Sequence, residues 1–167
     1  MGADHWKTVP DIMCVAKGIA GGVPMGVTLV RPDILSVMKK GEHSSTFGGN
    51  PLSCAAGTAT LQALTQDGLI ENAKDVGQKF RQRLDKLKDK HRIIREVRGN
   101  GLMIGVELKF EVKDILMEGI KNGLLLLYSG RNILRFLPPL VISEDDIAKT
   151  LKILDELLTN EEVRRNV

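Results

Sequence analysis

The chain has 167 residues, of which 43% are hydrophobic and 27% are charged, and its formal net charge is +3. This length predicts one domain or at most two small ones, and the composition is that of an ordinary globular protein. It excludes low-complexity disorder, collagen and a disulfide-stapled miniprotein, and the net charge is too small for a dedicated nucleic-acid binder. No apolar run is long enough to span a bilayer or to act as a leader after Met1, so we expect a cytoplasmic protein without membrane contact.

The cysteines and histidines do not form a metal-ligand pattern. Cys14 and Cys54 lack C-x-x-C spacing, and His5, His43 and His91 lack the spacing of metal ligands or of a catalytic triad. We therefore expect no metal site. The cysteines are predicted to be reduced, small, buried thiols.

The first third of the chain is rich in glycine and is expected to contain mainly loops. We predict a short buried strand over residues 26–30 and a short helix over 32–40. Asn50-Pro51 is a strong helix start, because Asn caps free amides and Pro fits the first helical position. The helix that follows, to about Gln66, is rich in small residues and is predicted to be a core helix that packs closely against other backbone.

From about residue 67 the pattern predicts a compact α+β unit with helices on one face of a small sheet. The elements expected there are a long amphipathic helix from Leu69 to Leu87, a hairpin of strands 93–97 and 102–108, a helix over 112–122, strands 124–128 and 133–137, and a last helix that begins with a capping box of Ser143 and Asp146.

Lys17 is the first residue that could carry chemistry. It follows the apolar run 12–16 and immediately precedes a glycine. A lysine at the end of a buried strand, beside residues that allow close backbone approach, can be desolvated, lose its proton more readily and form a Schiff base. The alternative is a lysine whose stem packs on the strand end while its ammonium group reaches solvent.

A second candidate precedes the helix start at Asn50. Ser44, Ser45 and Thr46, followed by Gly48-Gly49, place hydroxyl donors next to free amides and the positive end of a helix dipole, an arrangement that can bind a phosphate group. It is not a Walker loop, because no Gly-Lys-Ser/Thr follows. An ordinary hydroxyl-rich cap explains the same residues equally well.

Arg135 is the third candidate, a charged residue inside the apolar strand predicted over 133–137. A guanidinium group on a rigid strand is suited to bidentate capture of a carboxylate. An internal ion pair would also explain it.

Five motifs occur in order along nearly the whole chain. They are Pro10-Asp-Ile-Met-Cys-Val-Ala-Lys17-Gly18, Gly22-Val-Pro-Met-Gly26, Ser45-Thr-Phe-Gly-Gly-Asn-Pro-Leu52, Val97-Arg-Gly-Asn-Gly-Leu-Met-Ile-Gly105 and Leu134-Arg-Phe-Leu-Pro-Pro-Leu140. Together they resemble the C-terminal part of class III pyridoxal-phosphate-dependent aminotransferases, particularly the acetylornithine and acetyl-lysine type.

The resemblance implies an α/β fold of type I, in which residues 1–66 end the large cofactor-binding domain and residues 67–167 form a small α+β C-terminal domain. The cofactor would be pyridoxal 5'-phosphate. The lysine matching Lys17 forms the Schiff base with it, and the segment matching Ser45 and Thr46 binds its phosphate, with the threonine reaching across a dimer interface. The arginine matching Arg135 faces the substrate carboxylate.

The implied reaction is transfer of the ω-amino group of an N-acetylated ornithine or lysine to 2-oxoglutarate, in arginine or lysine biosynthesis. Ornithine, 4-aminobutyrate and other ω-amino substrates remain alternatives. The resemblance also implies a homo-oligomer, most simply a dimer, or a complementing N-terminal half.

Family members are more than twice this length, and most of their central sheet lies upstream of the lysine motif. The pyridinium-pairing carboxylate and the ring-stacking aromatic lie there too, so the chain is expected to be incomplete and inactive alone. A non-catalytic interaction domain and a phosphate-ester binding module are the competing hypotheses.

Overall fold

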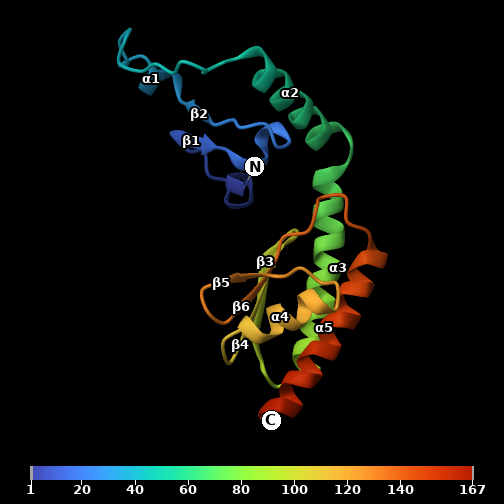
Figure 1. The fold of residues 1–167 in the computed structure, drawn as a ribbon. Coiled ribbons are helices and arrows are strands. Elements are labelled where there is room, and N and C mark those ends of the chain that lie inside the picture. Colours follow the sequence, from blue (N-terminus) through green and yellow to red (C-terminus); the bar gives the residue numbers. More distant parts are fainter. Residues whose placement is uncertain (1, 167) are drawn as a thin grey trace. The chain divides into compact units, whose positions relative to one another are not determined.

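The computed structural model describes residues 2–166 and divides into two compact units of mixed helix and sheet, one ending at Asp67 and one beginning at Gly68 (Figure 1). The elements of the first unit are the 3-10 helix η1 (Gly2–Trp6), strand β1 (Ile12–Val15), the 3-10 helix η2 (Lys17–Ala20), strand β2 (Val27–Val30), helix α1 (Pro32–Leu35) and helix α2 (Pro51–Gln66). Within the described residues, no helix combines the length and the apolar character needed to cross a membrane.

The first unit has almost no core of its own. Strands β1 and β2 pair antiparallel, with Ile12 opposite Val30 and Val15 opposite Val27, but none of their residues is buried. Ala20 is the only buried hydrophobic residue of this unit among the described residues. The expectation of buried strands here is therefore wrong, because a two-stranded sheet has no second layer to cover it.

Helix α1 is shorter than predicted. It ends at Leu35, and the chain continues in tighter turns, with Val37 N–H donating to the Ile34 carbonyl and Met38 N–H to the Leu35 carbonyl. The residues from Ser36 to Lys40 are therefore not helical.

Helix α2 begins as predicted, but it is not a core helix. The Asn50 side chain accepts a hydrogen bond from Ser53 N–H, 2.9 Å away, and Pro51 occupies the first turn. Only Ser53 and Gly57 are buried. Because its small residues give the helix little apolar surface, it packs closely on one narrow stripe and stays exposed elsewhere.

The two cysteines are also more exposed than predicted. Both are free thiols, as expected, but Cys14 lies on the uncovered strand β1 and Cys54 on the exposed side of α2. Among the described residues of the first unit, no second layer packs over either position.

The second unit is a four-stranded antiparallel sheet with three helices. Its elements are α3 (Leu69–Lys90), β3 (Ile94–Asn100), β4 (Met103–Leu108), α4 (Lys113–Lys121), β5 (Leu127–Ser129), β6 (Ile133–Phe136) and α5 (Glu144–Arg165). The strand order is β3-β4-β6-β5, and every neighbouring pair is antiparallel. Figure 1 shows the long helices α3 and α5 side by side next to the sheet, where they also contact each other.

One hydrophobic core joins the three helices to one face of this sheet. Alternate residues of the central strands point into it, among them Ile104 and Val106 of β4 and Leu134 of β6. Phe80 of α3 meets Phe136 of β6 edge to face, with ring centroids 5.2 Å apart. The residues that alternate with the buried ones along β4 and β6 face the other side of the sheet, which is partly exposed.

The local signals of the second unit are largely confirmed. The Ser143 hydroxyl accepts from Asp146 N–H while the Asp146 carboxylate accepts from Ser143 N–H, which completes the predicted capping box. The strand predicted from Leu124 begins only at Leu127. The reason is that Leu124 N–H donates to the Gly119 carbonyl, 2.8 Å away, and so closes the end of α4 instead of joining the sheet.

Helix α3 approaches the turn of the β3–β4 hairpin so closely that only glycine fits. A Cβ atom on Gly77 would collide with the carbonyl group of Gly101, which is backbone and cannot rotate away. Gly101 itself has a φ of 54°, in the left-handed region. This contact fixes the position of the hairpin relative to the helix.

We predict that Gly77→Ala destabilises the second unit by about 2 kcal/mol or more, the range of overpacked sites. In an exposed helix the same change would stabilise by about 0.5–1 kcal/mol. Urea unfolding followed by circular dichroism measures the difference, and Gln78→Ala at the exposed neighbouring position is the control, expected to be near neutral. Equal stabilities for the two variants would contradict a tight contact.

A buried histidine connects the end of α3 to α5. His91 is 1% exposed, with Nε2 2.6 Å from Asp155 Oδ1 and Nδ1 2.9 Å from Glu162 Oε2. Hydrogen bonds, first from Lys90 and then from His91, hold the pKa of Asp155 below its usual value. A pKa lowered by folding means that Asp155 stabilises the fold at neutral pH, and that this contribution is lost as the pH falls through the lowered value.

We expect His91→Leu to cost about 3 kcal/mol, because two partly buried carboxylates lose a shared partner. Lys90→Ala removes a largely exposed partner of the same Asp155 and should cost less than about 1 kcal/mol. Denaturant midpoints of the two variants test this ranking, and a larger loss for Lys90→Ala would refute it.

Candidate active site

Lys17 begins the short helix η2 in an unfavourable backbone conformation. Its φ is 56°, in the left-handed region that non-glycine residues rarely adopt, and the preceding Ala16 is extended. Its side chain is exposed and makes no hydrogen bond or ion pair with the described residues. Lys17 thus follows an exposed strand rather than a buried one, and its amine is accessible.

The segment from η2 to Met25 packs against α2 along a stripe of small residues spaced one helical turn apart. The Ser53 hydroxyl donates to the Pro24 carbonyl, a Cβ on Gly57 would lie 3.0 Å from Met25 Sδ, and one on Gly21 would lie 3.1 Å from Thr60 Oγ1. This packing, which the small-residue composition predicted, holds the backbone around Lys17 on the side of α2.

Ser45 and Thr46 lie in the turn that leads into the same helix. The Ser45 carbonyl accepts from Gly48 N–H at 3.2 Å, and Asn50 Nδ2 donates to the Phe47 carbonyl at 3.0 Å, so the turn is closed by its own backbone and by the Asn50 side chain. Both hydroxyl side chains are exposed, and neither has a partner among the described residues. The capping role belongs to Asn50, which leaves these hydroxyls free for a ligand.

Arg135 lies on β6, on the sheet face opposite the core. Its neighbours Leu134 and Phe136 are buried, whereas Arg135 is exposed, opposite Gly105 of β4 and Leu127 of β5. It makes no ion pair with the described residues, so an internal pair does not account for it.

A charged cluster that the sequence analysis did not single out lies on the same face. Glu107, with its side chain 15% exposed, accepts hydrogen bonds from Arg98 at 2.7 Å, Arg95 at 3.0 Å and Asn132 at 3.3 Å. The Arg98 hydrogen bond, with a further one from Arg95, holds the pKa of Glu107 below its usual value. The sequence feature that could have revealed this cluster is an acidic residue, Glu107, within the otherwise apolar strand predicted over 102–108.

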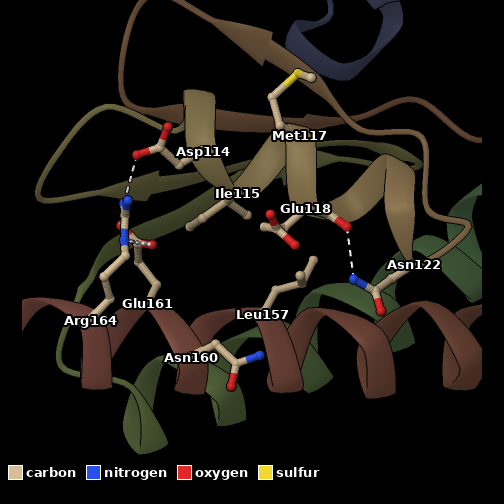
Figure 2. A pocket seen from close by; sticks show the side chains of 9 residues that line it. All are labelled: Asp114, Ile115, Met117, Glu118, Asn122, Leu157, Asn160, Glu161 and Arg164. Atoms are coloured by element: carbon tan, nitrogen blue, oxygen red, sulfur yellow. Dashed lines mark hydrogen bonds and ion pairs between the residues drawn. The ribbon is translucent and has the colours of Figure 1, made fainter.

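A pocket of about 350 Å³ lies between α4 and α5, and none of the residues predicted for the site lines it (Figure 2). Arg164 crosses it to pair with Asp114 at 2.7 Å and with Glu161 at 2.6 Å. Burial raises the pKa of Glu161, but hydrogen bonds from Arg164 and Arg165 outweigh it and the pKa is lowered. Glu161 and Arg164 both belong to α5, and the ion pair between Arg164 and Asp114 joins α5 to α4. We therefore assign the pocket a structural role.

The structure thus places Lys17, Ser45 and Thr46 in the first unit, on segments that border α2. Arg135 belongs to the second unit, with the Glu107 cluster beside it on the sheet. Among the described residues there is no group of three or more His, Cys, Asp or Glu side chains suited to hold a metal ion.

The fold is that of the C-terminal part of fold-type-I pyridoxal-phosphate-dependent aminotransferases. The acetylornithine aminotransferase of Elizabethkingia anophelis matches 96% of this chain with a TM-score of 0.89 and 34% identity, while 43% of that protein is covered. An ornithine aminotransferase of Toxoplasma gondii, whose active site holds pyridoxal phosphate at partial occupancy, matches the whole chain with a TM-score of 0.93 and 33% identity, and 40% of it is covered.

The class III aminotransferase family model matches residues 1–158, and the chain belongs to this family. The acetylornithine aminotransferase of Caldanaerobacter subterraneus is 45% identical over 159 residues, which are 95% of this chain and 40% of that protein. Ornithine aminotransferase 1 of Staphylococcus saprophyticus is 39% identical over 95% of this chain and 40% of its own length. The chain therefore spans about 40% of the length of these relatives.

Proposed function

We propose that the chain carries the amine nucleophile, a phosphate contact and a carboxylate receptor of a pyridoxal-phosphate-dependent aminotransferase. The observation that supports this most is the accessible, unpaired amine of Lys17 on a left-handed residue. Lys7 also has a positive φ, but it follows the end of η1, where such a conformation is common. Lys17 begins a helix instead, so no ordinary capping role explains its conformation.

The residues present fit the cofactor. Lys17 offers a free amine for its aldehyde, and the hydroxyls of Ser45 and Thr46 offer free donors for its phosphate. When bound, pyridoxal phosphate supplies an electron sink for the negative charge that develops at the substrate carbon. Lys17 Nζ would take the proton from the carbon that bears the amino group, hold it and return it, as a general base and then a general acid.

Arg135 would orient the substrate by binding its carboxylate. An arginine on the rigid strand β6, without a partner of its own, offers two parallel N–H donors to a planar anion. We propose an N-acetylated ornithine or lysine as the amino donor and 2-oxoglutarate as the acceptor, since both carry a carboxylate. The acetylornithine and ornithine aminotransferases among the relatives support this substrate class.

We expect Lys17 to be the lysine that pyridoxal phosphate modifies. The chain is incubated with the cofactor and reduced with borohydride, and the modified peptide is identified by mass. Labelling should concentrate on Lys17 and disappear in Lys17→Ala, because the proposal assigns the aldehyde of the cofactor to this exposed, unpaired amine. Lys7→Ala, at the other lysine of positive φ, is the matched control and should leave the labelling unchanged.

Diffuse labelling over the exposed lysines would contradict the assignment of Lys17. Competition distinguishes the phosphate-ester hypothesis, because pyridoxine phosphate has the phosphate but no aldehyde. Equal affinity for the two compounds would favour a phosphate-ester binding module. Labelling restricted to Lys17 that Thr46→Val weakens would support the proposed site.

We further propose that the first unit functions in contact with additional polypeptide, a second copy of this chain or a complementing N-terminal portion. Large apolar side chains are exposed on it, including Phe47 at 81% and Leu52 at 73%, next to the proposed phosphate segment. Ala20 is its only buried hydrophobic residue among those described. A surface of this kind is typical of an interface.

We expect the chain to form oligomers in sedimentation velocity experiments. Phe47→Ser combined with Leu52→Ser should raise the dissociation constant at least about tenfold, since burying one large apolar side chain contributes about 1.5–3 kcal/mol. Val163→Ser, at an equally exposed apolar position of the second unit, is the control. A stable monomer at high concentration would contradict the proposal for self-association.

A further inference from the structure

The unpaired state of Arg135 needs an explanation, because a carboxylate lies close to it in the sheet. Glu107 is directly opposite Ile133 on β6, and Arg135 is two residues further along the same face. Diagonal neighbours of this kind lie about 7–8 Å apart between Cα atoms, which long side chains bridge easily. A free Glu107 would therefore be a natural ion-pair partner for Arg135.

Both oxygens of Glu107 are already engaged by other residues. Arg98 Nη1 donates to Oε2 at 2.7 Å, while Arg95 Nη1 and Asn132 Nδ2 donate to Oε1 at 3.0 and 3.3 Å. The pairing of β3 with β4 shifts register between Ile94 and Glu96, and both Arg95 and Arg98 reach the same carboxylate. The arginines thus draw Glu107 toward β3.

On this face the residue between Arg98 and Arg135 is Gly105, which is opposite both of them in the sheet and has no side chain of its own to pair with either arginine. The Ile133 side chain lies over Gly105, with Cγ2 3.2 Å from the position of a Cβ, and it is apolar. Leu127 borders Arg135 on its other side and offers no acceptor. Glu107 is therefore the one strand neighbour of Arg135 that carries a carboxylate, and both of its oxygens already accept hydrogen bonds.

We propose that Arg95 and Arg98 are positioning residues, which occupy Glu107 and thereby keep the Arg135 guanidinium group free to bind the carboxylate of the substrate. The proposal rests on the function proposed above for Arg135. It extends that function by naming three residues, Arg95, Arg98 and Glu107, that set how available the receptor is. Without the two arginines, Glu107 would turn to Arg135 and compete with the substrate.

The test measures how fast a dicarbonyl reagent such as phenylglyoxal modifies Arg135 in the chain, by quantitative peptide mass. The combined variant Arg95→Gln and Arg98→Gln should slow modification of Arg135 about twofold to fivefold, the population shift that an exposed ion pair produces. Adding Glu107→Gln to this variant should restore the original rate, because the competing carboxylate is gone. Arg131, which pairs with Glu111, is the internal reference and should not change.

An unchanged rate at Arg135 in the double variant would overturn the proposal. The proposal would also be overturned if modification of Arg135 stayed slow after Glu107→Gln was added. In that case the slowing would come from a general loss of structure and not from competition by the Glu107 carboxylate. Glutarate added to the original chain distinguishes the proposed function of Arg135 from this inference. If the order of rates holds but glutarate gives no protection, Arg135 is kept free by its neighbours yet is not the carboxylate receptor.

Discussion

The second unit depends on one constraint, which is that its four-stranded sheet buries only one face. Helices α3, α4 and α5 supply the cover, and alternate residues of β4 and β6 point into the core beneath them. Strand periodicity then directs the intervening residues to the other side. Arg135 and the Glu107 cluster owe their accessibility to this alternation, and the tight approach at Gly77 and the capping box of Ser143 serve to hold the covering helices in place.

In the first unit, the proposed chemistry lies on segments that gain little from burial. The left-handed backbone at Lys17 costs free energy, and the only evident compensation is the packing of η2 and Met25 on the small-residue stripe of α2. The helix is also the element into which the segment with Ser45 and Thr46 leads. One helix with few large side chains, α2, therefore positions both the Lys17 segment and the segment with Ser45 and Thr46. The exposed side chains of Phe47 and Leu52 form an apolar surface of the kind that another polypeptide covers.

The sequence was most informative where a local rule decides the structure. Asn50-Pro51, the capping box at Ser143 and the hairpin of β3 and β4 are fixed by nearby hydrogen bonds, and the structure has each of them, although β3 continues to Asn100 and the turn lies at residues 101–102. Burial was harder to predict, because it depends on what packs against an element. Cys14 and Cys54 are residues of a type that is usually buried, but in the structure both are exposed. The role of Glu107 was not predicted, because it depends on the strand register, which brings Glu107 close to residues that are distant in sequence.

Apolar burial is distributed very unequally between the two units. All the buried hydrophobic residues except Ala20 belong to the unit that begins at Gly68, among the described residues. Chaperones and proteases bind polypeptide that exposes apolar side chains and opens easily, and they set how much of a marginally stable protein persists in a cell. If another polypeptide covers the first unit, the abundance of this chain would follow the supply of that polypeptide, and turnover of unassembled copies would begin upstream of Gly68.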